Sequence, residues 1–415
     1  MVLLMTAAGC RQSEGNKPAR SDSAQVNHTE GSPEKEPATE ETLREEKLTE
    51  EISTEEPSTE EPSLEGDSAS GNLSNGSEDD KGNRLITDMA GREVLIENRI
   101  EKIYSTGQPG VVMLYTLCPD KLLGWCMKLS REEAKYIDPR YLSLPVLGLM
   151  QGNNNTANKE EIMRRNPDMV LFMTDIAEDT IESADEMQEM MGIPVVVADY
   201  HLDRLSDTYQ FLGEILKETK RADELSAYCK DTVTQAIRAA AAIPMEERKR
   251  IYYAQGSTGM QTAPKGSSHS EVIDLVGGEN TVILKANTDG RLTINMEQLL
   301  IYNPDIIIAS YSMGHNNTKK DAFSIITNGS KEWKLLDAVK NGMIFNTPAY
   351  PYNWLDMPPS VNRIIGIKWM GNLLYPDYYP FDMKEEVLDF YQLFYNKKLS
   401  QEELNLLLGN AVREG

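Results

Sequence analysis

Four side chains between residues 201 and 315 are candidate axial ligands for a metal. They are His201, Met260, His269 and His315. Imidazole nitrogen and thioether sulfur can serve as axial ligands for haem, cobalt or nickel, so each residue is a candidate for contact with a metal. The ordinary alternative is a solvated side chain on a loop. His269 is the best placed of the four, because a predicted helix begins directly after it.

A short turn, Tyr350-Pro-Tyr-Asn-Trp354, brings Tyr350, Tyr352 and Trp354 within five residues. Aromatic rings on a rigid turn offer a flat apolar contact to a macrocycle or a catecholate ring, and a tyrosine phenolate can bind ferric iron. The alternative is a turn that caps the core beneath the final helix. Nearby, Arg363 could hold an anionic chelate or support a helix that begins near Pro359, and Asp356 could cap that helix.

Short apolar runs alternate with helical patterns along most of the chain. Strands are predicted at residues 86–96 (two, around a turn), 100–106, 122–126, 169–173, 195–198, 250–255, 305–310 and 343–347. Helices are predicted at residues 110–117, 159–165, 270–276, 296–301, 359–374 and 384–394. This alternation predicts an α/β fold with parallel sheets.

Loops that follow the predicted strands supply further candidates for ligand contact. They are Gln108, Trp125, Gln151, Gln255 and Tyr311. In open parallel sheets, ligands bind at the carboxyl ends of the strands, where these loops converge.

The pattern changes between residues 204 and 243. Apolar residues such as Leu205, Tyr209 and Leu212 recur at helical spacing, and the segment contains no proline and only one glycine. We predict one long connecting helix here, with a break near residues 217–220. It divides the ordered chain into an N-terminal lobe, residues 84–203, and a C-terminal lobe, residues 244–415.

An internal repeat relates the two lobes. Residues 160–171 read Glu-Glu-Ile-Met-Arg-Arg-Asn-Pro-Asp-Met-Val-Leu, and residues 297–308 read Glu-Gln-Leu-Leu-Ile-Tyr-Asn-Pro-Asp-Ile-Ile-Ile. Each is a helix that ends at Asn-Pro-Asp and is followed at once by an apolar strand. Equivalent elements at equivalent places indicate two lobes of similar build.

The N-terminal part of the chain has a different composition. The chain has 415 residues and a net charge of −24, and residues 11–80 hold 20 acidic and 6 basic residues, so about −14 lies in that stretch. Residues 11–83 are poor in large apolar side chains and are predicted to form a disordered acidic tether. Residues 1–10 form a short apolar run that ends in Ala-Ala-Gly-Cys10, which resembles a lipoprotein signal with lipidation at Cys10. The alternative is a chance apolar N-terminus.

The remaining cysteines and the net charge limit the function classes. The cysteines Cys118, Cys126 and Cys229 form no Cys-x-x-Cys pair, so a thiolate metal cluster is not indicated. We expect them to be buried and apolar, with one bridge between Cys118 and Cys126 as the open alternative. The acidic net charge argues against nucleic acid as a partner.

Several motifs in this order resemble one family. They are Asp-Met-Ala-Gly-Arg-Glu-Val at residues 88–94, the paired Glu-x(6)-Pro-Asp motifs, and Ile-Asp-Leu-Val-Gly-Gly-Glu-Asn at residues 273–280. Together they are similar to the solute-binding lipoproteins of ABC importers for iron siderophores, haem and cobalamin. The resemblance implies two Rossmann-like lobes joined by one long helix, with the ligand in the cleft between them and limited hinge motion.

The resemblance also implies partners. In that family one surface glutamate on each lobe pairs with arginines of the membrane permease, and the matching positions are Glu160 and Glu297. The alternative is a solvated glutamate favoured by the helix dipole, and Glu161 adjoins the first position. We therefore expect a monomer, anchored to the bacterial cell membrane through Cys10, that delivers a metal chelate to a permease and its ATPase. No intrinsic cofactor is expected.

Three alternatives stay open. A receptor for free zinc, manganese or nickel would need three or four converging ligands, and the predicted ordered part holds only three histidines. An enzyme is disfavoured because no Gly-x-Ser-x-Gly, P-loop, His-Glu-x-x-His or Gly-x-Gly-x-x-Gly motif stands in a fitting context. A surface adhesin or sensor could use the same two-lobed fold.

Overall fold

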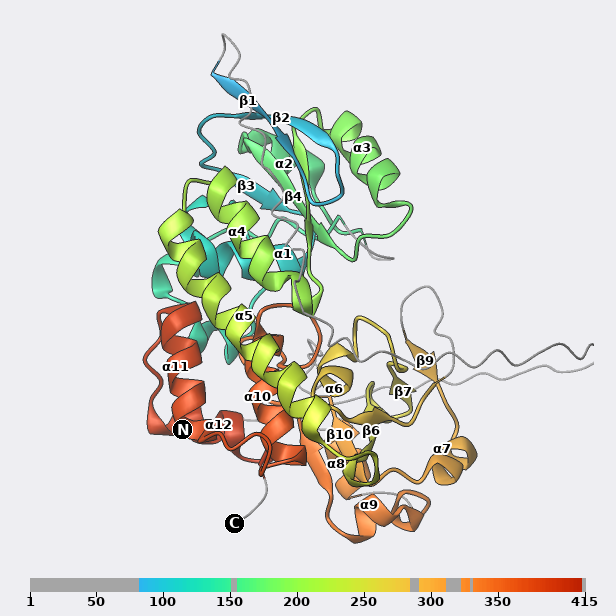
Figure 1. Ribbon diagram of the computed structural model, residues 1–415. Helices are drawn as coiled ribbons and strands as arrows, with labels where there is room; N and C mark the ends of the chain where they lie inside the picture. The colour runs from blue at the N-terminus through green and yellow to red at the C-terminus, as the bar shows by residue number, and fades with distance from the viewer. Residues whose placement is uncertain (1–81, 151–154, 284–290, 311–321, 329–330, 413–415) are drawn as a thin grey trace, which may run out of the picture. The chain divides into compact units, whose positions relative to one another are not determined.

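A computed structural model describes residues 82–150, 155–283, 291–310, 322–328 and 331–412 (Figure 1). They belong to one compact unit, Ser70–Gly415. The predicted signal with Cys10 and nearly all of the predicted tether lie outside these residues. Within them, no helix is both long enough and apolar enough to cross a bilayer.

The N-terminal lobe contains a hairpin and a parallel sheet. Strands β1 (Asn83–Thr87) and β2 (Glu93–Glu97) pair antiparallel around the predicted turn, where Gly91 has a φ of +82°. Strands β3 (Ile103–Ser105), β4 (Met169–Thr174) and β5 (Val195–Asp199) form a parallel sheet in that order.

The predicted strand at residues 122–126 is wrong. Leu122 and Trp125 each form only a single bridge, to Ile103 and to Val146. The backbone of Trp125 bonds to Pro145 and Leu147, so a neighbouring loop satisfies the hydrogen bonds that a sheet would otherwise provide.

Alternate residues of this sheet face different helices. Met169, Leu171 and Met173 share a core with α1 (Gln108–Leu117) and α4 (Leu205–Ile215). Val170 and Phe172 share a second core with α2 (Lys159–Arg164) and α3 (Thr180–Met191). A sheet buried on both faces explains why its strands read as continuous apolar runs.

The connecting segment consists of two helices, α4 and α5 (Thr219–Ala242), and the break lies where the sequence predicts it. Lys217 has a φ of +59° in the short link between them. The helices pack closely, because a Cβ atom on Gly213 would lie 2.1 Å from the Cβ of Ala222.

The C-terminal lobe repeats the α/β plan. Its parallel sheet has the order β11 (Ile344–Asn346), β10 (Ile306–Ala309), β6 (Arg250–Ala254) and β8 (Glu279–Asn280). Strands β7 (Gln261–Thr262) and β9 (Leu292–Thr293) form a small antiparallel pair. The lobe's short helices are α6 (Glu271–Leu275), α7 (Met296–Tyr302), α8 (Ala322–Thr327) and α9 (Asp337–Lys340). The predicted α/β fold with parallel sheets is confirmed.

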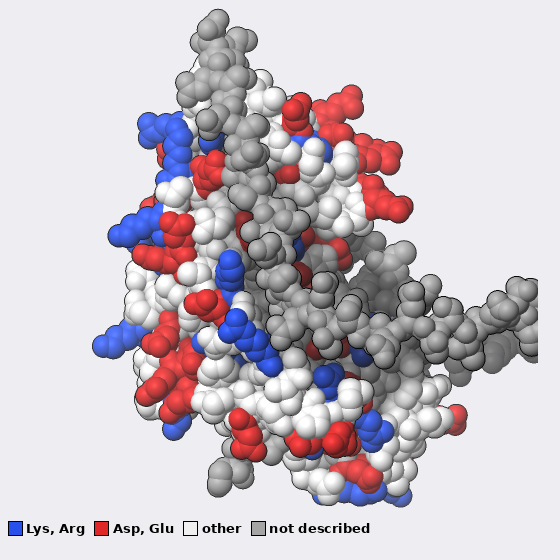
Figure 2. Space-filling view, in the orientation of Figure 1, with Lys and Arg blue, Asp and Glu red and all other residues white. Residues whose placement is uncertain are grey.

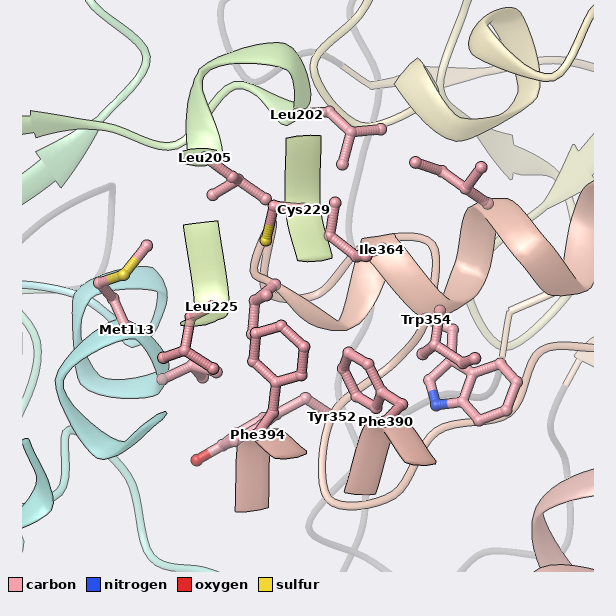
Figure 3. Close-up of a cluster of buried hydrophobic side chains, with 14 of the residues drawn as sticks. Met113, Leu202, Leu205, Leu225, Cys229, Tyr352, Trp354, Ile364, Phe390 and Phe394 are labelled. Atoms are coloured by element: carbon pink, nitrogen blue, oxygen red, sulfur yellow. The ribbon is translucent and has the colours of Figure 1, made fainter. Parts of the chain in front are cut away.

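Three C-terminal helices complete one core that both lobes share. They are α10 (Asn362–Leu374), α11 (Met383–Tyr395) and α12 (Gln401–Leu408). Their buried side chains join a continuous cluster with α1, α4, α5 and the strands of both sheets. Figure 3 shows part of it, including Phe390 and Phe394 of α11, whose ring centroids lie 4.6 Å apart.

Surface charge is mixed on the face drawn in Figure 2. Basic and acidic side chains lie close together over most of it, and acidic side chains gather where α3 lies. Helix α3 carries Glu182, Asp185, Glu186 and Glu189, and Asp185 forms an ion pair with Arg92.

Candidate functional site

A buried carboxylate organises polar side chains at the carboxyl edge of the C-terminal sheet. Asp356 is 0% exposed, and it accepts hydrogen bonds from His269 Nδ1 at 2.6 Å, Arg291 at 2.9 Å and Gln255 Nε2 at 3.3 Å. Gln255 directly follows β6, while Asp356 lies in the loop after β11. Burial opposes ionisation, but the hydrogen bond and charge of His269 and the charge of Arg291 hold the pKa of Asp356 below its usual value.

This arrangement fixes the orientation of the His269 ring. Because Nδ1 bonds to Asp356, Nε2 points away from that carboxylate, and no described residue bonds to Nε2. The side chains of His269 and Arg291 are partly exposed, at 18% and 29%. A carboxylate-backed imidazole is the arrangement that proteins use to orient a metal ligand.

A second polar cluster lies at the carboxyl edge of the N-terminal sheet. Asp199 ends β5, and its carboxylate bonds to His201 Nδ1 at 2.9 Å, while His201 Nε2 lies 3.3 Å from Asp175 after β4. The hydrogen bond to Asp199 outweighs burial and raises the pKa of His201 to about 9. His201 is therefore a cation at neutral pH, with both ring nitrogens engaged.

Arg363 connects the two clusters. It is 0% exposed and donates hydrogen bonds to the carbonyls of Tyr200, Ser268 and Ser360 and to the carboxylate of Glu271. Its guanidinium also lies 5.9 Å from the centroid of the Tyr200 ring. Burial raises the pKa of Glu271, although Arg363 and His201 oppose that shift. Arg363 thus holds a loop of the N-terminal lobe against the C-terminal lobe.

Three predicted aromatic contacts lie in the core instead of on a surface. Trp354, labelled in Figure 3, is 0% exposed, and its Nε1 donates to Tyr391 Oη at 3.2 Å. Tyr352 and Trp125 are each 3% exposed, and Trp125 Nε1 donates to the carbonyl of Tyr141. Tyr350 is partly exposed and stacks on Tyr136, with 5.9 Å between centroids. The burial of Trp354, Tyr352 and Trp125 leaves these side chains little surface to offer a ligand.

The other predicted ligand contacts are scattered. Gln108 is the partly exposed first residue of α1, and Met260 packs partly against the core of the C-terminal sheet. Gln151, Tyr311 and His315 lie outside the described residues. Of the candidates, the structure brings together Gln255 and His269 through Asp356, with Arg363 nearby.

Several residues of the site were missed from the sequence. Arg291, Glu271, Asp175 and Asp199 carry no motif of their own. Asp199 could have been noticed, because a carboxylate directly after a Val-Val-Val-Ala run lies at the edge where ligands bind. Asp356 was noticed only as a possible helix cap.

The two predicted docking glutamates occupy equivalent, exposed positions. Glu160 and Glu297 are the second residues of α2 and α7, and neither forms an ion pair with a described residue. The adjacent Glu161 is different, because it pairs with Arg164 and Arg165.

A cavity of about 430 Å³ lies apart from these groups. Lys249, Asp305 and Met343 line it, and these residues precede β6, β10 and β11, so the cavity is at the amino edge of the C-terminal sheet. Among the described residues, no three His, Cys, Asp or Glu side chains are grouped to hold a bare metal ion. Cys118, Cys126 and Cys229 are buried and free, so the open alternative of a Cys118–Cys126 bridge is excluded.

Comparison with known proteins gives a consistent result. A family described as periplasmic binding protein matches residues 127–351, more than half of the chain. An ABC transporter solute-binding protein from Sulfurospirillum deleyianum is similar, with 27% identity and a TM-score of 0.71 over 78% of this chain and 99% of that one. No curated protein matches the sequence.

Two further solved structures share the fold. A periplasmic solute-binding protein from Veillonella parvula has 24% identity and a TM-score of 0.63, covering 79% of this chain and 98% of that one. The periplasmic binding protein MolA from Haemophilus influenzae, solved with molybdate, has 20% identity and a TM-score of 0.62, covering 76% and 99%.

Proposed function

The chain belongs to the periplasmic binding protein family, and we propose that it captures a metal chelate, such as a ferric siderophore, haem or a corrinoid, for an ABC importer. As the substrate-binding protein of an ABC transporter it works outside the cytoplasm with a membrane permease. The ligand would lie between the carboxyl edges of the two sheets, where His201, His269 and Arg291 are placed.

The observation that carries the proposal is His269 held by buried Asp356. The bond at 2.6 Å orients the ring, and no described residue bonds to Nε2, which can therefore meet the metal of a chelate. A single such imidazole suits a metal that already has most of its ligands, whereas a bare ion needs three or four from the protein.

Arg291 adds charge recognition at the same place. Its guanidinium lies on the other oxygen of Asp356 and is partly exposed. Together with cationic His201 across the site, it favours a ligand with peripheral carboxylate or catecholate oxygens.

Binding to His269 variants tests this proposal. A ferric catecholate, a ferric hydroxamate, haem and cobalamin are each titrated into the full-length protein while visible absorption is recorded. We expect a one-to-one complex with one chelate, a shifted absorption band, and an affinity at least about ten-fold weaker in His269→Gln.

The matched control for the metal contact is His201→Gln, because Nδ1 of His201 bonds to Asp199 and Nε2 lies 3.3 Å from a carboxylate oxygen of Asp175. This variant should leave the absorption band in place, and any loss of affinity in it reports the loss of its positive charge and not of a metal contact. Identical affinity and spectra for wild type and His269→Gln would remove His269 from the ligand site.

Membrane attachment through Cys10 is also proposed. A Cys10→Ser variant expressed in a bacterial host should move from the membrane fraction to the soluble fraction, with ligand affinity unchanged. Equal membrane association of both proteins would argue against a lipid anchor at this residue.

A further inference from the structure

Helices α2 and α7 are equivalent in structure as well as in sequence. Asn158 and Asn295 cap them by accepting from the backbone N–H three residues later, and Ile162 and Leu299 occupy the same buried position. Asn166 and Asn303 both have positive φ after the last turn. The Asp of each Asn-Pro-Asp sequence also has an equivalent role. Asp168 accepts hydrogen bonds from the backbone N–H groups just before β3, and Asp305 accepts one from the first backbone N–H of β6.

The exposed faces of these equivalent helices differ in charge. Residues 159–165 carry three basic and two acidic side chains, and Glu161 pairs with Arg164 and Arg165. Residues 296–302 carry one charge, Glu297. The segment that contains α7 is therefore net negative. The segment that contains α2 is net positive, although it includes Glu160.

The faces also differ in apolar exposure. Glu297 and Ile301 are four residues apart on one helix, so they share a face. Ile301 is 76% exposed, and its counterpart in α2 is Arg164, a charged residue. One exposed isoleucine alone is ordinary on a protein surface. Here it lies one turn from a carboxylate that has no ion pair with a described residue.

We propose that the two lobes dock unequally on the importer's permease, and that Glu297 with Ile301 forms the dominant contact. This inference rests on the proposed function. The partner is a membrane permease that presents an arginine against Glu297 and an apolar side chain against Ile301. Attraction at Glu160 is weaker, because Arg164 and Arg165 lie on the same helix and repel an approaching arginine.

Neither residue is needed to build α7. The asparagine cap, buried Leu299 and the turn at Asn303 define the helix, while Glu297 and Ile301 are exposed. Substitutions at these two positions therefore test docking without removing a core contact.

The test measures binding of the full-length protein to the permease–ATPase complex of its own importer, held in lipid nanodiscs. The variants are Glu160→Ala, Glu297→Ala and Ile301→Ala. Ile237→Ala is the matched control, because Ile237 is an exposed isoleucine on α5, at 52%.

We expect Glu297→Ala and Ile301→Ala each to raise the dissociation constant at least about ten-fold, and Glu160→Ala less than about three-fold. Ile237→Ala should change nothing. An effect of Glu160→Ala as large as that of Glu297→Ala, or equal behaviour of the two isoleucine variants, overturns the inference. If wild type fails to bind the complex at all, the proposed importer role fails and takes this inference with it.

Discussion

Buried carboxylates set the direction of the polar side chains in the site. Asp356 orients His269 and Arg291, and Asp199 orients His201. In each case an acid near the end of a sheet strand, or in the loop after one, holds a cationic or metal-binding side chain at the carboxyl edge of its sheet. The orientation of the groups that could contact a ligand therefore depends on carboxylates that do not have to contact the ligand themselves.

The His201 cluster predicts a pH dependence of stability. The folded protein has a His201 pKa of about 9, whereas the unfolded chain has the ordinary value near 6.5, so folding binds this proton more tightly. The stabilisation is complete below pH about 6.5 and is lost as the pH rises to about 9. Chemical denaturation of wild type and His201→Gln should give unfolding free energies that converge over this interval. Parallel curves would show that His201 gains no proton on folding.

Residue types alone indicated only half of the site. His269 and Gln255 stood out because of their chemistry and their position after predicted strands. The buried partner Asp356 is 87 residues from His269 and 65 from Arg291, so tertiary structure decides those contacts. The burial of Tyr352 and Trp354 in the turn at residues 350–354 could not be predicted for the same reason, since a surface turn and a core turn can share one local sequence.

The packing of helix α4 against helix α5 depends on one glycine. Gly213 of α4 faces Ala222 of α5 with no room for a second methyl group. Gly213→Ala should lower the free energy of unfolding by about 1–3 kcal/mol, the usual cost of overpacking. Urea denaturation measures this loss.

The paired substitution supplies the control. Gly213→Ala with Ala222→Gly restores the space and leaves one glycine and one alanine in the two helices. This double variant should recover most of the lost stability. Failure to recover would show that the cost of Gly213→Ala does not come from that contact.

Elements with a strong local pattern were predictable. The buried strands at residues 169–174 and 250–254 read as apolar runs, and the repeat marked α2 and α7 with their asparagine ends. Residues 122–126 look like a strand, but Trp125 exchanges backbone hydrogen bonds with residues 145 and 147, and Leu123 donates one to Ile103 of β3. Local sequence shows that a segment is extended and apolar without identifying its partner.

Two features hold the two lobes of the described unit together: the shared core and Arg363. Arg363→Met removes the bonds to the Tyr200 carbonyl and Glu271 and leaves a partly buried carboxylate unpaired. We expect a loss of about 3 kcal/mol in the free energy of unfolding, and faster amide exchange in residues 200–204. Hydrogen exchange with mass spectrometry measures both.

Arg204→Met is the matched control, because Arg204 belongs to the same loop and forms an exposed ion pair with Asp207. It should cost less than about 1 kcal/mol. If both arginine variants exchange alike, Arg363 does not hold the lobes together.

Native mass spectrometry of the full-length protein tests the central claim most directly. The protein is measured as isolated and then with haem, cobalamin, a ferric catecholate, a ferric hydroxamate, Zn²⁺ and Ni²⁺. We predict a one-to-one complex with one intact chelate, weakened in His269→Gln. Binding of bare Zn²⁺ or Ni²⁺ alone, or of nothing in the panel, would contradict it.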